Sequence, residues 1–374
     1  MTKIRVGIVG LSSKPGAWAA LAHLPRLASS PNFEIVAMCN STLASTKAAI
    51  TAHNLSEDTV KAYDSYDAIA VDPDVDLFVV STRVDSHLDV VVPALKARRN
   101  VFVEWPLATT TEEARQIAAL ARDQGVRTMI GFQARASPSI NKIRELVSTG
   151  AVGEIHSVNY HGVINNWQDN AADERYAHFL QRKVGANPLT IYGGHALDSI
   201  LFAIGELKPG TYQALAVNLR PRMPIKRAAD GTLSPELYDK DTPDQILLQG
   251  QFDRSPPAVL SFHLRGGARF PDAPGSTWEI FGTKAILVVT FASAGPQMAK
   301  ALTFRRYDLA TKAVEDIVVD EGGDEWTSLP NQGQNIGRLY EAYAAGAGYA
   351  DFDLAVKRHE LLDEFWASME GRQA

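Results

Sequence analysis

Two acid–base side chains lie about one helical turn apart near the middle of the chain. The segment GGHALDSILFAIGE, residues 193–206, contains His195 after a pair of glycines and Asp198 three residues later. In a helix this spacing makes the two residues neighbours, so the Asp198 carboxylate could orient the His195 imidazole for proton transfer near neutral pH. The same residues are equally compatible with a histidine bonded to the backbone at a helix start and an aspartate with a structural role.

A glycine- and serine-containing loop near the N-terminus could bind a pyrophosphate. Residues 7–25 read GIVGLSSKPGAWAALAHLP, in which a serine takes the place of the second glycine of the G-x-G-x-x-G fingerprint and the loop is longer than usual. Glycines in that fingerprint let backbone N–H groups approach a pyrophosphate at a helix N-terminus. The residues expected at the phosphates are Gly10, Leu11, Ser12, Ser13 and Gly16. Trp18 lies on this loop or in the core, and an ordinary strand-to-helix connection is the alternative for the whole loop.

The end of the second expected strand indicates which dinucleotide is bound. An NAD site usually has a carboxylate there for the ribose 2′-hydroxyl. This chain has Asn40, Ser41 and Thr42 at that place, with Lys47 shortly after them. Because no carboxylate would repel a 2′-phosphate, the sequence favours NADP(H) over NAD(H). Ser and Thr are also good helix N-caps, and both roles are compatible.

These residues need a scaffold, and the first 133 residues have the pattern of one. Strand-like runs at 4–10, 33–39, 75–82, 100–105 and 126–132 alternate with helix-like runs at 17–29, 42–54, 86–99 and 110–125. This alternation predicts an α/β Rossmann domain over residues 1–133, with a parallel sheet and helices on both faces.

The pattern changes in residues 134–374, which we expect to form a substrate-binding and dimerisation domain of the α+β class. Strand-like runs at 155–164, 212–220, 245–252, 258–266, 277–290 and 301–309 predict a large, mostly antiparallel open sheet. Helices are expected near 137–149, 193–204, 333–346 and 353–370, the last two packing back on the chain, and the polar segment 221–244 is expected to be a loop. A sheet with one uncovered apolar face predicts a homodimer or a dimer of dimers.

Composition excludes several other classes of protein. The net charge of −6 argues against binding to nucleic acid or to a membrane surface. Cys39 is the only cysteine, and no Cys/His cluster has the spacing of a zinc site, so neither a disulfide framework nor a metal is expected. The apolar part of MTKIRVGIVG is too short for a signal peptide, and no apolar run is long enough for a membrane span. A soluble, cytoplasmic protein is expected.

The order of these motifs resembles the glucose–fructose oxidoreductase / inositol dehydrogenase (Gfo/Idh/MocA) superfamily over nearly the whole chain. The matching segments are VGIVG (6–10), HLP (23–25), STRVDSH (81–87), VFVEWPLA (101–108) and GGHALDSILFAIGE (193–206). The loop GLSSKPGAWA, VEWPLA, GFQARASPSI (131–140) and GGHALD are similar to one branch, the galactose-regulon inhibitor proteins and their oxidoreductase-like relatives. The resemblance implies a Rossmann domain followed by a domain with a large open sheet that is often used for dimerisation.

The resemblance also implies roles for single residues. Those expected to contact the cofactor are Ser81, Thr82, Arg83, His87, Glu104, Trp105, Pro106 and Gln133, in addition to the loop and ribose residues above. Those expected to contact the substrate are Trp105, Arg135, Trp167 and His195, and the expected catalytic residues are His195, Asp198, Tyr176 and Lys183. Arg135 could equally form an interdomain ion pair, and His87 could simply begin a helix.

This chain departs from the dehydrogenases of that superfamily at two catalytic positions. The resemblance implies Glu-Lys-Pro at 104–106 and an aspartate four residues before His195, but the chain has Trp105 and Ile191 there. Indole offers one N–H donor and no base. Trp105 could therefore pack in a nucleotide sensor, form a wall of a pocket whose acid is His195 or Tyr176, or support a cationic substrate.

These residues and the resemblance are compatible with two functions. We expect an NADP(H)-dependent oxidoreductase that moves a hydride to or from a small carbonyl, imine or sugar-like substrate. The alternative is a catalytically inert nucleotide-binding transcriptional regulator that binds a partner protein, because some members of the resembled branch act in that way.

Overall fold

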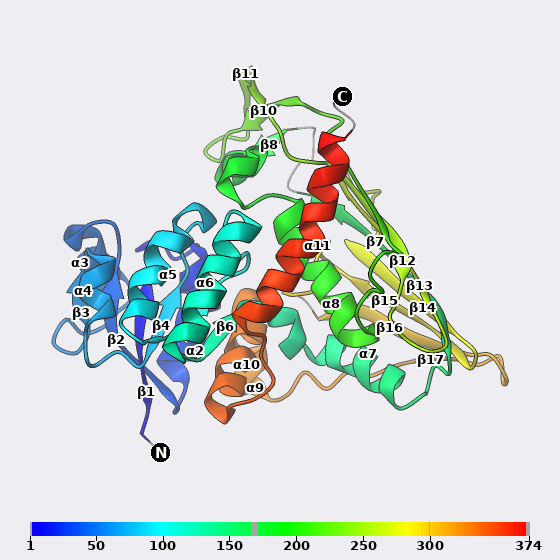
Figure 1. Ribbon diagram of the computed structural model, residues 1–374, viewed down its shortest axis with the longest axis horizontal. Helices are drawn as coiled ribbons and strands as arrows, with labels where there is room; N and C mark the ends of the chain where they lie inside the picture. Colours follow the sequence, from blue (N-terminus) through cyan, green and yellow to red (C-terminus); the bar gives the residue numbers. More distant parts are fainter. Residues whose placement is uncertain (1, 166–170, 299, 372–374) are drawn as a thin grey trace. The chain divides into compact units, whose positions relative to one another are not determined.

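The computed structural model describes residues 2–165, 171–298 and 300–371 (Figure 1). It contains two compact units. The first comprises Met1–Ala136 and Gly322–His359, and the second comprises Ser137–Glu321 and Glu360–Ala374. A late segment of the chain, 322–359, therefore belongs to the first unit.

The first unit contains a parallel sheet of six strands in the order β3-β2-β1-β4-β5-β6. The strands are β1 (Ile4–Val9), β2 (Phe33–Cys39), β3 (Lys61–Tyr63), β4 (Leu77–Val80), β5 (Asn100–Val103) and β6 (Thr128–Ile130). The predicted Rossmann-like sheet is confirmed. Strand β3 was not expected, because three residues of mixed polarity give no strand signal.

The helices of this unit connect the strands, as the alternating pattern predicted. They are α1 (Trp18–Ala22), α2 (Leu24–Ser29), α3 (Leu43–Ala52), α4 (Tyr66–Ala70), α5 (His87–Lys96) and α6 (Thr111–Gln124). Helix α6 shows why these residues are helical: Thr110 caps its first turn, Glu112 and Glu113 complement the helix dipole, and Gly125 ends it at φ 65°.

The late segment joins the first unit through its apolar face. It forms α9 (Asp324–Thr327), α10 (Asn331–Ala345) and the first residues of α11 (Phe352–Glu370). Ile336, Leu339, Tyr340 and Tyr343 of α10 are in the same buried cluster as Val6 and Ile8 of β1. The backbone N–H of Ile130 also donates to the carbonyl of Ala350 at 2.9 Å. Burial of these apolar residues of α10 explains why the late segment belongs to the first unit.

The second unit contains a sheet of eight strands in the order β17-β16-β15-β14-β7-β13-β12-β9, with β8, β10 and β11 in a smaller sheet. The strands of the large sheet are β7 (Ile155–Ile164), β9 (Gln213–Val217), β12 (Gln245–Gln251), β13 (Val259–Gly266), β14 (Ser276–Gly282), β15 (Ala285–Phe291), β16 (Ala301–Asp308) and β17 (Val314–Asp316). Neighbouring strands are antiparallel except β7 and β13, which are parallel. The expected large, mostly antiparallel sheet is confirmed.

Alternation along the strands gives this sheet two different faces. Strands β14 and β15 each bury every second residue. Helices α7 (Pro138–Ser148) and α8 (Gly194–Ile204) lie along one face, as Figure 1 shows. A π-helical turn, Leu189–Gly193, leads directly into α8. The run 277–290, expected as one strand, is a hairpin of β14 and β15.

The prediction that 221–244 is a loop is wrong. The segment contains β10 (Arg222–Lys226) and β11 (Leu233–Asp239), which form the smaller sheet with β8 (Ala172–Asp173). Met223 is buried against Leu180. The polar composition of the segment is misleading because its buried polar groups are paired. Lys240 Nζ donates to the Thr242 carbonyl at 2.7 Å and to Asp244 Oδ2 at 3.1 Å.

Candidate functional site

The strand order reverses between β1 and β4, which is the place where open α/β sheets bind ligands. Gly10 and Ser81 follow these two strands. A Cβ on Gly10 would lie 2.5 Å from the Ser81 carbonyl oxygen, and the φ of Gly10 is +96°. Only glycine fits at this position. The close approach brings the phosphate-loop candidate and the end of β4 together at the carboxyl edge of the sheet.

The loop after Gly10 is held by polar contacts from two side chains outside it. Asn40 Nδ2 donates to the Leu11 carbonyl at 2.9 Å, and His53 Nε2 lies 2.7 Å from the Ser12 carbonyl. Ser13 is exposed. A Cβ on Gly16 would meet nothing within 4 Å, so the loop leaves open space on that side. Trp18 is partly buried against the hydrophobic core rather than standing free on the loop.

The end of β2 has no carboxylate, but the end of the neighbouring strand has one. Thr42 caps α3 by accepting from the Ser45 backbone N–H at 3.1 Å, which confirms its capping role, whereas Ser41 is exposed. Asp64 follows β3, the strand that the sequence did not reveal. Burial, with a smaller contribution from the charge of Asp64, raises the pKa of the Cys39 thiol to about 11.

Three buried histidines contact the segment Glu104–Leu107 that follows β5; we call them the histidine cluster (His23, His87 and His359). His23 is completely buried at the junction of α1 and α2. Its Nε2 lies 2.8 Å from Glu104 Oε1, without the alignment of a hydrogen bond, and its Nδ1 is hydrogen-bonded to the Tyr340 hydroxyl at 2.7 Å. Glu104 is thereby held next to an imidazole that Tyr340 orients.

The second member of the cluster contacts the next two residues of the segment. His87 Nδ1 lies 3.0 Å from the carbonyl oxygen of Pro106 and 3.3 Å from that of Leu107. Its Nε2 lies 3.3 Å from the Thr82 carbonyl. Burial lowers the pKa of His87, so the ring is neutral and can donate through only one nitrogen at a time. His87 therefore contacts both the residue after Ser81 at the end of β4 and the 104–107 segment. Its role is not limited to beginning α5.

The third member contacts Trp105. The indole is 3% exposed, and its ring centroid lies 4.8 Å from that of His359 and 4.5 Å from that of Phe132. Burial lowers the pKa of His359 to about 3. The peptide bond between Trp105 and Pro106 is cis, as the sequence allowed. These contacts favour a packing role for the indole over an open wall.

Buried polar atoms without a protein partner gather at the carboxyl ends of three adjacent strands. Ser81 Oγ follows β4, Glu104 Oε1 follows β5 without an aligned hydrogen bond, and Gln133 Oε1 lies three residues after β6. His359 Nε2, beside Trp105, is another. Most buried polar groups in proteins are paired. This set therefore fits a polar ligand, and a dinucleotide with its ribose hydroxyls and carboxamide is of that kind.

The remaining cofactor and substrate candidates differ in exposure. Thr82 accepts from Ser86 Oγ at 2.8 Å, and exposed Arg83 pairs with Asp85 at 2.8 Å. Arg135 is half-buried in the short helical turn after β6. Trp167 lies outside the described residues.

The proton-transfer candidates all lie in the second unit. His195 and Asp198 occupy adjacent turns of α8 and are 4% and 1% exposed, and the His195 carbonyl accepts from Ser199 Oγ at 2.7 Å. The spacing expected from the sequence is therefore present. Tyr176 is 36% exposed in a 3-10 segment, Glu174–Leu180, and Lys183 is exposed in the next one. His195 and Asp198 therefore lie on the same buried helix, whereas Tyr176 and Lys183 are on the surface.

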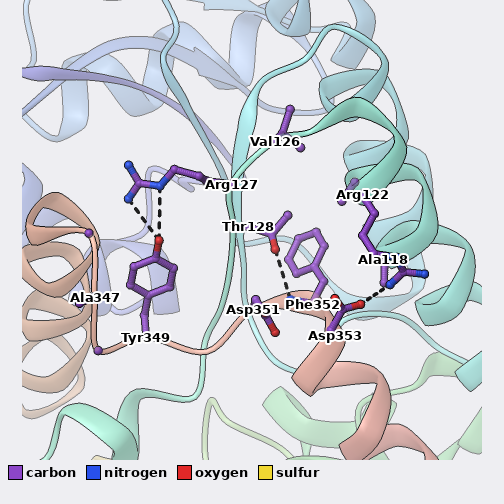
Figure 2. A pocket seen from close by; sticks show the side chains of 13 residues that line it. Ala118, Arg122, Val126, Arg127, Thr128, Ala347, Tyr349, Asp351, Phe352 and Asp353 are labelled. Atoms are coloured by element: carbon purple, nitrogen blue, oxygen red, sulfur yellow. Dashed lines mark hydrogen bonds and ion pairs between the residues drawn. The ribbon is translucent and has the colours of Figure 1, made fainter.

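A pocket elsewhere in the first unit provides a contrast. The cavity of about 410 Å³ lies at the amino end of β6, beside the loop between α10 and α11 (Figure 2). Its charged groups are already paired: Arg122 bonds to Asp353, and Arg127 donates to the Tyr349 hydroxyl at 3.2 Å and to the Tyr343 carbonyl at 2.7 Å. Paired groups of this kind leave little for a ligand to satisfy, unlike those at the carboxyl edge.

The sequence missed His23, Tyr340 and His359 as site residues. His23 lies inside the HLP segment that contributed to the family resemblance, and this was a usable signal. Tyr340 and His359 are more than 200 residues from β5 in the sequence and follow no motif. Among the described residues there is no group of three or more His, Cys, Asp or Glu side chains that could hold a metal, and no helix long and apolar enough to cross a membrane.

Two family models match successive parts of this chain. Residues 4–132 match the model of the oxidoreductase family with the NAD-binding Rossmann fold, and residues 138–290 match that of the Gal80p C-terminal domain. The dehydrogenase aclE of Aspergillus oryzae is 34% identical over 99% of this chain and 97% of its own length.

Two further relatives extend the comparison. The galactose/lactose metabolism regulatory protein GAL80 of Saccharomyces cerevisiae is 29% identical, over 97% of this chain and 86% of its own. A crystal structure of a super-repressor mutant of Gal80p from that yeast superposes with a TM-score of 0.87 at 23% identity, over 98% of this chain and 96% of that one. Levoglucosan dehydrogenase in complex with NADH and L-sorbose shares the fold, with a TM-score of 0.75 at 17% identity, over 99% and 98% of the two chains.

The order of motifs, the parallel sheet with its glycine-dependent turn and the full-length similarity all agree. This chain belongs to the Gfo/Idh/MocA oxidoreductase family with an NAD-binding Rossmann fold, in the branch that shares the Gal80p C-terminal domain.

Proposed function

We propose that this protein is an NADP(H)-dependent oxidoreductase acting on a small carbonyl, imine or sugar-like compound. The main observation behind the proposal is the set of buried, unpartnered polar atoms on Ser81, Gln133 and His359 at the carboxyl edge of the sheet. A purely structural edge would be expected to pair these atoms. The full-length similarity to a protein named as a dehydrogenase supports an enzyme rather than a binding module.

The dinucleotide would be held along the carboxyl ends of β1, β2, β4 and β5. The Gly10–Gly16 loop would bind the pyrophosphate, and Glu104 and Gln133 would bind at the nicotinamide side. When bound, NADP(H) supplies or accepts a hydride. Asn40, Ser41 and Thr42 favour the phosphorylated cofactor because they place no negative charge beside a 2′-phosphate. The carboxylate of Asp64, the residue after β3, would act against this preference.

His195 is the proposed proton donor or acceptor for the substrate oxygen or nitrogen, with Asp198 orienting it on α8. Trp105 cannot take the role of the family lysine, because indole has no basic nitrogen at neutral pH. Tyr176 and Lys183 remain secondary candidates, and Arg135 and Trp167 are proposed substrate contacts. An acid–base residue of this kind contributes about 10²–10⁴-fold to turnover.

A regulatory function is the second candidate, and one specific observation favours it. The position of the catalytic lysine is filled by an indole that is 3% exposed and packed against Phe132 and His359. A nucleotide-binding regulator needs no proton donor there. The similarity to GAL80, named as a regulatory protein, extends over 97% of this chain. In that case the partner protein would contact the β10–β11 hairpin or the open face of the large sheet.

Steady-state oxidation of NADPH with a panel of ketones, sugars and cyclic imines tests the two functions. The proposal expects turnover of at least one class, faster with NADPH than with NADH. Tight NADPH binding in a fluorescence titration, combined with no turnover of any class, would favour the regulator.

The proposal also includes an oligomeric state and a cellular compartment. Leu247 of β12, Phe281 of β14 and Val288 of β15 are partly exposed on the face of the large sheet that alternates with its buried residues. An apolar face of this size normally finds a partner, and we expect a homodimer or a dimer of dimers. A monomer mass by light scattering at micromolar concentration would contradict this. The single buried cysteine fits the reducing cytoplasm.

A further inference from the structure

His359 of α11 occupies an unusual place for a polar side chain. It is 5% exposed, and its ring lies 4.8 Å from the indole of Trp105, the residue that stands where related dehydrogenases have a lysine. Its Nε2 is buried without a partner in the protein. No sequence motif marks it, and the function proposed above counts its buried nitrogen among the unpartnered atoms without giving the residue a role of its own.

An unpaired buried nitrogen costs free energy, because that nitrogen has lost its hydrogen bond to water and gained none in return. A phenylalanine or leucine would fill the same space without that cost. Such costs are tolerated mainly at sites where a ligand completes the hydrogen bonding. The other two histidines of the cluster contact polar groups through both ring nitrogens, so His359 differs from its neighbours.

The surroundings of His359 point to the kind of ligand group. The other buried, unpartnered polar atoms at this edge are the hydroxyl of Ser81 and the amide oxygen of Gln133. The ring of His359 is neutral at pH 7, since burial lowers its pKa to about 3. A neutral imidazole donates or accepts one hydrogen bond through Nε2 according to its tautomer. It therefore suits an uncharged polar group and would not attract an anion.

We propose that His359 is a ligand-binding residue whose Nε2 hydrogen-bonds to an uncharged polar group bound beside Trp105. Two sources have this chemistry: the carboxamide of the nicotinamide ring and the oxygen or nitrogen of the substrate. In either case His359 supplies, from α11, a hydrogen-bonding group that Trp105 does not provide. This inference rests on the proposed binding of a nicotinamide dinucleotide.

His359→Phe tests the proposal, because it keeps a ring against Trp105 and removes the nitrogen. Without ligand, the variant should be as stable as the wild type or more stable in thermal unfolding. Tyr340→Phe is the matched control: it also removes one polar atom from a buried ring, but that atom is hydrogen-bonded to His23 at 2.7 Å, so this control should lose stability.

Ligand binding distinguishes the two sources. If His359 binds the nicotinamide, His359→Phe should weaken NADPH binding roughly 3- to 10-fold, the effect of one hydrogen bond, and leave unchanged the binding of 2′-phospho-ADP-ribose, which lacks nicotinamide. If it binds the substrate, NADPH binding should be unchanged and KM should rise by a similar factor. His359→Asn, which retains a hydrogen-bonding side chain, should lose less in either measurement.

Three results would overturn the inference. Unchanged NADPH affinity together with unchanged KM in His359→Phe would show that the nitrogen contacts no ligand. A loss of stability as large as that of Tyr340→Phe, with unchanged affinity, would show a structural role. Failure of the wild type to bind NADPH would refute the nucleotide site itself and this inference with it. NADPH binding without turnover would instead refute only the enzymatic function, and the NADPH comparison would still test His359.

Discussion

The imidazole of His359 and the indole of Trp105 lie with ring centroids 4.8 Å apart and ring planes inclined by 52°. A residue near the end of the chain therefore supports the segment that follows β5. Trp105 is buried and its indole packs against the rings of His359 and Phe132. The tryptophan is therefore part of a packed aromatic cluster at the position where related dehydrogenases have a lysine.

This contact predicts that restoring the family lysine will not restore a family reaction. Trp105→Lys would leave a cavity and bury an ammonium group in an apolar place, so we expect it to lower the free energy of unfolding by about 3–5 kcal/mol and not to raise turnover. Trp105→Phe, which keeps an aromatic ring, should cost less. Urea unfolding of the three proteins measures this. A stable and more active Trp105→Lys variant would show that the position is open and catalytic.

Replacement of His195 tests the proposed proton transfer. His195→Ala should reduce kcat by about 10²–10⁴-fold, the contribution of a general acid or base, and should leave NADPH binding unchanged because α8 is not part of the dinucleotide-binding sheet. Ser199→Ala is a suitable control, since it removes only the hydrogen bond to the His195 carbonyl. A fully active His195→Ala enzyme would refute the assignment.

Cofactor preference can be changed at the end of β2. Asn40→Asp places a carboxylate where the 2′-phosphate is expected and should weaken NADPH binding relative to NADH by about tenfold or more. The variant also loses the hydrogen bond from Asn40 Nδ2 to the Leu11 carbonyl. Asn40→Ala loses that bond without adding charge and is therefore the control. Wild-type protein that binds NADH as tightly as NADPH would contradict the prediction and would point to Asp64 as the residue that sets cofactor choice.

Acid should destabilise the protein partly through His359. Its pKa is lowered from 6.5 to about 3 in the folded protein, so between these values the unfolded chain binds the additional proton and stability falls as the pH falls. His359→Phe removes this contribution. Between about pH 7 and about pH 4.5 the variant should lose roughly 2–3 kcal/mol less unfolding free energy than the wild type. Equal losses in urea titrations at both pH values would show that the ring is solvated in the folded protein.

Local patterns predicted much of the fold. Strand–helix alternation predicted the parallel sheet of the first unit, and period-two runs predicted the large sheet of the second. The same reasoning failed at β10 and β11, because β11 is exposed along nearly its whole length and its polar residues give no alternating pattern. It also missed β3, since a strand of three residues carries too short a pattern.

The site residues could be predicted only where the residues that act together are close in the sequence. Gly10 and its turn, the cap at Thr42 and the His195–Asp198 spacing are all visible in short segments. The contacts of Glu104 with His23 and of Trp105 with His359 depend on tertiary packing between residues 81 and 254 positions apart, and no single segment records them. For this reason the sequence alone is compatible with several roles of Trp105.

Hydride transfer can be followed by mass spectrometry of products after incubation with NADPH deuterated at C4 of the nicotinamide and pooled ketones, sugars and cyclic imines. We expect a product that gains one deuterium with the wild type and scarcely any with His195→Ala. Tight NADPH binding by the wild type, with no deuterium in any product, would contradict it.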